Sequence, residues 1–178
     1  MFIIIVINSL KIGVVGDIMP VDSTLMSGQG VYSTSQGDFS MVFDSFKSYS
    51  ARYDFVVGNF EAILVDKINL SASESYSMKT PLSVIPVLQD CGFRYLSIAN
   101  NHSMEYGKEA FLWMCNQFDG AGLTTFGHKE KPYIIVNDSN TNLKVGLFAF
   151  STVPALYESA PEYYYVNHEV TKHMENLI

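Results

Sequence analysis

Positive charge is scarce in this sequence of 178 residues, and it is never clustered. Lysine and arginine together contribute 11 residues against 18 aspartates and glutamates, which gives a formal net charge of −7 and a pI near 4.9. No basic cluster exceeds two neighbouring residues. A protein that binds a nucleic-acid backbone needs a stripe of Lys and Arg, so we expect no nucleic-acid partner.

Cysteine and long apolar runs are scarce as well. The two cysteines, Cys91 and Cys115, each lie among apolar neighbours in a predicted helix, so we expect buried free thiols and no zinc ribbon. The apolar run over residues 1–7 is too short to span a bilayer, and it lacks the basic segment and cleavage site of a signal peptide. We interpret it as part of the first strand region, and the sequence leaves the compartment open.

What the chain does contain is enough apolar sequence for one folded domain over residues 1–178. Apolar residues make up 48% of the chain and charged residues only 16%, a balance typical of a globular core. The apolar runs predict strands, and the helix-period segments between them predict helices, in the order β, α, β, α, β, α, β, β. This order indicates an α/β layered domain with a largely parallel sheet.

The expected elements are defined by their residue ranges. Strands are predicted at 11–15, 54–58, 93–98, 133–136 and 143–150, and helices at 38–49, 81–91, 107–118 and 168–177. Thr80 and Pro81 are expected to open the second helix, and Pro86 to kink it. The polar stretches 27–37 and 71–77 are expected to be loops.

Polar residues follow three of the predicted strands at the point where each strand ends. Because the carboxyl ends of parallel strands meet at one edge of a sheet, these side chains are expected to share a site. Carboxylates, amide oxygens and imidazole are the groups that bind metal ions and activate water, and an imidazole can also donate a proton. The candidate site residues are Asp17, Asn59, Glu61, Asn101 and His102.

Each of these residues also has a purely structural interpretation. Asp17 could end a turn, and Asn59 and Glu61 could be ordinary loop residues. Asn101 could cap a turn beside a surface His102. The three clusters taken together favour the functional interpretation. The other histidines, at positions 128, 168 and 173, are expected on the surface.

Three segments resemble a known family of proteins. Gly16-Asp17-Ile18-Met19, Val57-Gly58-Asn59-Phe60-Glu61 and Ala99-Asn100-Asn101-His102, followed by Tyr106-Gly107, are similar to the CapA capsule-synthesis proteins. These poly-γ-glutamate capsule proteins belong to the calcineurin-like metallophosphoesterase superfamily. The resemblance covers about residues 11–151 and implies a metallophosphoesterase-like α/β sandwich. Two histidine motifs of the family's later half are missing here, which implies an amino-terminal portion with a fold incomplete at its C-terminus.

The resemblance also implies roles for the candidate residues. Asp17 would bind the first of two divalent metal ions, and Asn59 and Glu61 would sit at the bimetal centre. Asn101 would bind the second ion through its amide oxygen, and His102 would orient or protonate a leaving group. Manganese, iron and zinc all accept such mixed ligands, so the metal is not defined.

The leading functional hypothesis is a metal-dependent hydrolase, phosphoesterase-like, in capsule or poly-γ-glutamate metabolism. Its substrate would be an anionic polymer or a phosphoester, and membrane-bound capsule machinery would be a further partner. The alternatives are a non-catalytic capsule assembly or polymer-binding factor, and a truncated, inactive fragment.

Overall fold

The computed structural model describes residues 3–7, 10–22, 29–66, 78–139, 142–154 and 162–163. The strands in these ranges are β1 (Ile3–Ile7), β2 (Leu10–Ile18), β3 (Phe55–Phe60), β4 (Ile63–Val65), β5 (Lys79–Pro81), β6 (Phe93–Ser97), β7 (Thr124–Phe126), β8 (Tyr133–Asp138) and β9 (Leu143–Phe148). The helices are α1 (Val31–Thr34), α2 (Ser40–Ser50), α3 (Val84–Asp90) and α4 (Gly107–Gly120).

The main sheet has five strands in the order β1-β2-β3-β6-β7. β2, β3, β6 and β7 pair in parallel, and β1 pairs with β2 in the antiparallel direction. The central strand β3 begins with three buried apolar residues, Phe55, Val56 and Val57. A continuous apolar run of this kind is typical of a parallel strand that is covered on both faces. The predicted α/β class with a largely parallel sheet is confirmed.

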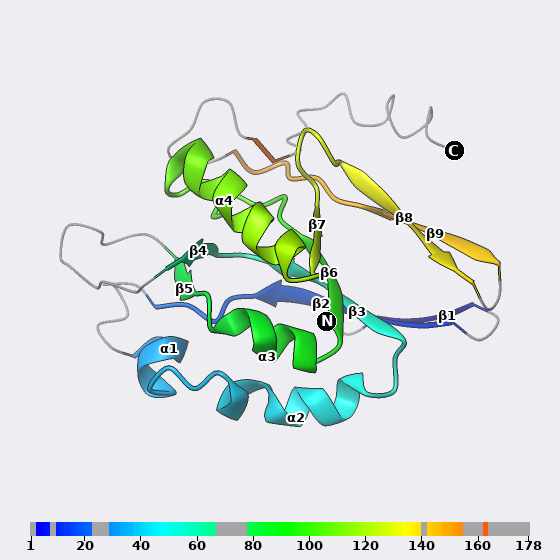
Figure 1. The fold of residues 1–178 in the computed structure, drawn as a ribbon, viewed down its shortest axis with the longest axis horizontal. Coiled ribbons are helices and arrows are strands. Elements are labelled where there is room, and N and C mark those ends of the chain that lie inside the picture. The colour runs from blue at the N-terminus through cyan, green and yellow to red at the C-terminus, as the bar shows by residue number, and fades with distance from the viewer. Residues whose placement is uncertain are drawn as a thin grey trace.

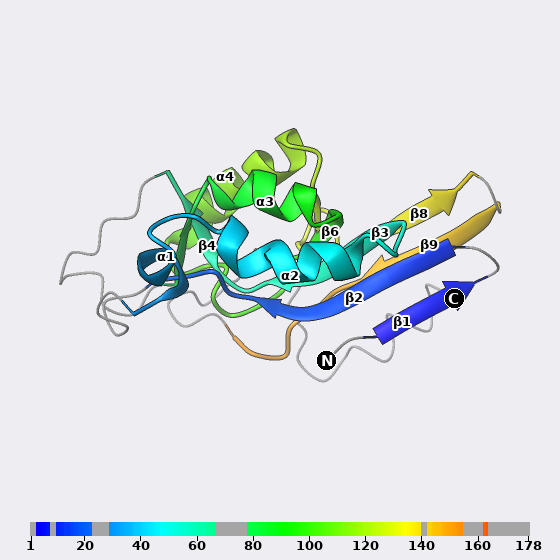
Figure 2. The same ribbon diagram turned by 90° about the horizontal axis from the view of Figure 1, so that it is seen from below.

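β3 leads directly into the short strand β4, which pairs with β5 at the left of Figure 1, and the arrow of β2 points toward the same side. Figure 2 shows α2 and α3 on the same side of β2, where Phe46 of α2 stacks on Phe93 of β6 with ring centroids 5.5 Å apart. On the α4 side, Phe118 meets Phe60 edge to face at 4.7 Å. These aromatic contacts pack α2 and α4 against the sheet, so the strand ends are held at defined positions.

Strands β8 and β9 form an antiparallel hairpin that lies at the opposite end of the molecule from β4 and β5 (Figure 1). Tyr133 pairs with Phe148, and the two rings stack at 6.3 Å. Ile134 and Val136 point toward the core, whereas Tyr133 and Ile135 are exposed. The predicted hairpin is therefore confirmed.

The predicted helix start at Thr80 and Pro81 is wrong. These residues belong to β5, which pairs in parallel with β4, and α3 begins at Val84. No kink is needed at Pro86, because it lies in the first turn of α3, where backbone N–H groups have no partner within the helix.

Other boundaries of helices and strands also differ from the predictions. Residues 31–34, expected as loop, form α1, and residues 3–7 form the separate strand β1. β3 continues through Asn59 and Phe60, so Asn59 lies within the strand and not after it. The loop predicted at 71–77, the helix predicted at 168–177, and His168 and His173 lie outside the described residues.

No helix within the described ranges is both long enough and apolar enough to cross a membrane.

Gly127 directly follows β7, and its backbone packs closely against the loop after β6. Its φ is +93°, and a Cβ there would lie 2.9 Å from Ala149 Cβ and 3.0 Å from Ala99 Cβ. Gly127→Ala is therefore expected to lower the free energy of unfolding by about 2 kcal/mol or more, through strain and overpacking. The control Gly120→Ala adds a Cβ with no neighbour within 4 Å, so it should not destabilise the fold. Equal midpoints in urea denaturation of the two variants would contradict this account.

Candidate active site

Asp17, Asn59 and Glu61 meet at the carboxyl edge of β2 and β3. A register shift between Val14 and Asp17 brings Asp17 opposite Asn59. Asn59 Nδ2 donates to Asp17 Oδ1 at 2.9 Å and to Glu61 Oε2 at 3.0 Å. The Glu61 backbone N–H donates to Ile18 O at 3.1 Å, which fixes the chain directly after β3. Two carboxylates therefore converge on one amide group.

The two carboxylates repel each other. Burial raises the pKa of Glu61 above its ordinary value, and the neighbouring Asp17 carboxyl raises it further, while His102 and Asn59 partly offset this. The Glu61 side chain is only 18% exposed, so solvent screens the repulsion incompletely. A like-charged pair of this kind favours the approach of a cation.

Asn100 is the buried hydrogen-bonding centre behind these residues, and it is only 5% exposed. Its Oδ1 accepts from the backbone N–H of His102 at 3.1 Å and of Ser103 at 3.0 Å. Its Nδ2 donates to Phe60 O at 2.9 Å and to Asn59 Oδ1 at 3.2 Å. The side chain therefore joins the turn after β6 to the end of β3.

This network also determines which way the Asn59 amide faces. Backbone N–H groups can only donate, and the Phe60 carbonyl can only accept, so the orientation of the Asn100 amide is fixed. Asn100 therefore donates an N–H to Asn59, and Asn59 must accept this hydrogen bond with its side-chain oxygen. The Asn59 NH₂ group consequently faces Asp17 and Glu61.

His102 lies in the turn between β6 and α4, between two carboxylates. Its Nδ1 is 2.5 Å from Glu105 Oε1, and its Nε2 is 3.9 Å from Glu61 Oε1. The His102 side chain is 18% exposed, whereas the Glu105 side chain is fully buried. The Nδ1 edge of the imidazole is thus held by Glu105, and Nε2 is directed toward the carboxylate pair.

The structure brings four of the five predicted site residues together: Asp17, Asn59, Glu61 and His102. Asn101 is half-buried next to them, but within the described chain it forms no hydrogen bond with the other four. Two further participants were not predicted, Asn100 and Glu105. The sequence signal for Glu105 is its spacing of three residues from His102, which suits a contact within a turn.

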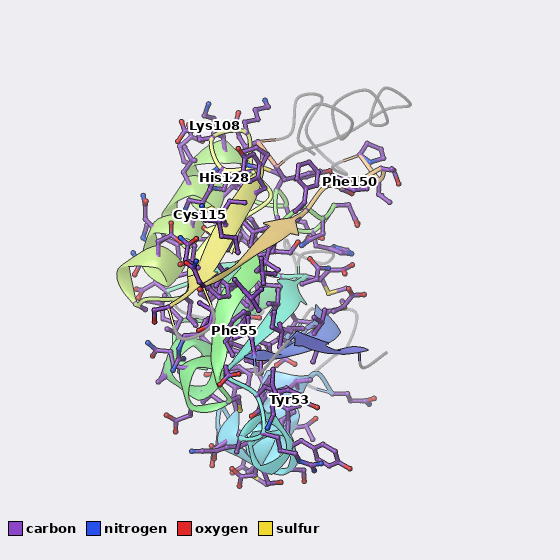
Figure 3. All side chains as sticks on the ribbon, turned by 90° about the vertical axis from the view of Figure 1, so that its right-hand side faces the viewer. Tyr53, Phe55, Lys108, Cys115, His128 and Phe150 are labelled. Atoms are coloured by element: carbon purple, nitrogen blue, oxygen red, sulfur yellow. The ribbon has the colours of Figure 1, made fainter. Side chains whose placement is uncertain are left out.

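His128 was expected on the surface, and this prediction is wrong. It is 9% exposed, and its ring meets Phe111 edge to face at 6.5 Å. Figure 3 shows it beside α4, between Lys108 and Cys115. Burial, reinforced by Lys131, lowers the pKa of His128. The surrounding strand and helix cover this loop, which its polar sequence did not indicate.

The two cysteines are buried and free, as predicted. Burial raises the pKa of the Cys115 thiol to about 12, and it also raises that of Cys91. Neither thiol belongs to the candidate active site.

The donor set fits a divalent cation in its chemistry, because hard carboxylate oxygens and an imidazole nitrogen surround one polar edge. Asp17 and Glu61 would hold such an ion, with His102 beside them. Asn59 would contribute an oxygen only after turning its amide away from Asn100. Among the described residues, no three His, Cys, Asp or Glu side chains already converge closely enough to form a ligand cage.

A largely parallel sheet packed against helices, with polar side chains at its carboxyl edge, belongs to an α/β protein of the metallophosphoesterase-like fold. The chain belongs to the family described as bacterial capsule synthesis protein PGA_cap, whose family model matches residues 11–176. This confirms the resemblance to CapA proteins.

One relative provides an independent comparison. The PGA biosynthesis protein CapA of Bacillus subtilis (strain 168) is 29% identical over 95 residues, which cover 53% of this chain and 25% of that protein. The matched segment therefore spans only a quarter of the relative's length.

Proposed function

We propose that this protein is a metal-dependent hydrolase of capsule or poly-γ-glutamate metabolism, acting at a phosphoryl or acyl centre. The observation that carries the proposal is the meeting of the Asp17 and Glu61 carboxylates on one amide, with His102 directed toward them. The capsule synthesis family supplies the biological setting.

Each residue has a distinct role in this proposal. Asp17 and Glu61 bind the divalent cation, with Asn59 and Asn101 as further ligands of a pair of Mn, Fe or Zn ions. Bound metal lowers the pKa of a water molecule and polarises the substrate oxygen. His102 holds or transfers a proton at Nε2, the ring atom that faces the carboxylates.

The proposed substrate is an anionic polymer or a phosphoester. The name of the Bacillus relative refers to PGA biosynthesis, and a polyanion would need a cation to approach this acidic edge. Membrane-bound capsule machinery is proposed as the partner that supplies or receives the polymer.

Cation binding can be tested by thermal unfolding with added Mn²⁺. At a free concentration about 100 times Kd, one site adds about 2.7 kcal/mol of stability, which raises Tm by about 5–11 °C. Asp17→Asn should remove most of this increase. The control Asp90→Asn removes a carboxylate from the exposed Lys47–Asp90 pair and should leave the increase intact.

An equal Mn²⁺ response in the Asp17→Asn protein would contradict a site at this edge. Mn²⁺ binding that stabilises the fold without hydrolysis would favour the second candidate, a polymer-binding or assembly factor. That candidate is favoured by the lack of a closely converged ligand cage among the described residues.

A further inference from the structure

Glu105 is the most deeply buried acidic side chain next to the candidate active site, with an exposed fraction of 0%. Burying a carboxylate is costly unless its oxygens have partners. Both oxygens of Glu105 are occupied: Oε1 lies 2.5 Å from His102 Nδ1, and Oε2 accepts from the Met78 backbone N–H at 2.5 Å. Because the side chain is fully buried, it presents no oxygen to a substrate or a metal ion.

The second contact connects Glu105 to the strand pair that follows Glu61. Met78 donates its N–H to Glu105, and its carbonyl accepts from the Ile63 N–H at 2.9 Å. Ile63 begins β4, two residues after Glu61. Glu105 therefore fixes the imidazole of His102 relative to the same segment of backbone that carries Glu61.

The pairing also determines where the imidazole proton lies. A carboxylate can only accept hydrogen bonds, so the neutral His102 ring must donate from Nδ1. Its Nε2 then carries a lone pair and faces Glu61 Oε1 at 3.9 Å, a separation too long for a hydrogen bond.

We infer that Glu105 is a positioning residue that holds His102 in the Nδ1–H tautomer and directs the Nε2 lone pair toward the candidate active site. The use of Nε2 in turnover rests on the proposed hydrolase function, whereas the tautomer does not. The arrangement follows the general pattern in which an outer carboxylate orients a functional histidine.

Glu105→Gln provides a sharp test, because glutamine has one oxygen and one NH₂ group. Its oxygen would still accept from Met78 N–H, and its NH₂ would then donate to His102 Nδ1. This would move the ring proton to Nε2. Glu105→Asp keeps the carboxylate, and Glu109→Gln makes the same chemical change on the exposed surface of α4.

The measurement is the ¹⁵N NMR spectrum of the histidine side chains in the full chain, under alkaline conditions that keep imidazole neutral. We expect the Nδ1–H signature for His102 in the wild type, Glu105→Asp and Glu109→Gln proteins, and the Nε2–H signature in Glu105→Gln. His128 should be unchanged throughout and serves as an internal control. An Nε2–H ring in the wild type, or the same tautomer in Glu105→Gln, would overturn the inference.

This spectrum needs neither substrate nor metal, so its outcome is independent of whether the protein is a hydrolase. Where turnover is detected, Glu105→Gln should lower kcat by about 10–100-fold, as removal of an outer-shell partner does. Glu105→Asp should restore part of that loss. An unchanged kcat in Glu105→Gln, together with a changed tautomer, would show that Glu105 sets the tautomer of His102 and would overturn its role in turnover.

Discussion

Asn100→Ala is expected to destabilise the protein strongly, whereas Asn101→Ala should not. The Asn100 side chain is 5% exposed and provides both the acceptor for His102 N–H and Ser103 N–H and the donor for Phe60 O. Its removal leaves these buried backbone groups without partners, at a cost of about 3 kcal/mol or more. Tm should fall by about 6–12 °C.

Asn101 is the matched control, because it is the same residue type at the next position. It forms no hydrogen bond with the other candidate residues in the described chain, so its truncation should change stability by about 0.5 kcal/mol or less. Under the metal-site proposal, Asn101→Ala should instead weaken the Mn²⁺ response. Differential scanning calorimetry with and without Mn²⁺ measures both effects in one experiment.

Asn100→Asp is a second variant with nearly the same shape. Aspartate keeps an acceptor for the two N–H groups, but it turns an oxygen toward Phe60 O and Asn59 Oδ1, where Asn100 presents an NH₂ group. We expect it to be destabilising at neutral pH, and less so under acidic conditions, where the carboxyl regains a proton. Equal stability of the wild type, Asn100→Ala and Asn100→Asp would contradict the central role of Asn100.

The sequence predicted the strands that carry the site because each is rich in β-branched, aromatic and other apolar residues. β2, β3 and β6 were recognised in this way, and the convergence of Asp17, Asn59 and Glu61 followed from their parallel pairing. The three-residue strands β4, β5 and β7 were missed, because three residues are too few to show a period. Thr80–Pro81 was misread for the same reason, since a helix start and a short edge strand share these residues.

Which of Asn100 and Asn101 forms the buried hydrogen-bond network could not be predicted from sequence. Adjacent residues in a turn point in directions set by the local backbone, and nothing in the pair Asn-Asn indicates which amide faces the core. The same limit applies to Glu105, whose burial depends on Met78 from a distant part of the chain. Residues at strand ends were predictable, and the residues that orient them required the fold.

Replacement of His102 is expected to remove turnover without removing the fold. His102 is 18% exposed, and its loss leaves the Asn100 network in place, because Asn100 contacts only the His102 backbone. With a model substrate such as bis(para-nitrophenyl) phosphate and Mn²⁺, His102→Ala should lower kcat by about 100- to 10,000-fold, the usual contribution of a general acid or base. Its Tm should fall, because Oε1 of the buried Glu105 loses its imidazole partner, but the protein should remain folded at the assay temperature, since Glu105 Oε2 keeps the Met78 contact.

His128→Gln is the contrasting control, because His128 is buried against Phe111 and has no contact with the carboxylate pair. It should lower Tm while leaving kcat of the folded protein near the wild-type value. Added imidazole should restore part of the activity of His102→Ala, since the truncated side chain leaves space where the ring was, and it should not affect His128→Gln. Retained turnover in His102→Ala would exclude His102 as the proton-transfer group, and the activity would then depend on Asp17 and Glu61 alone.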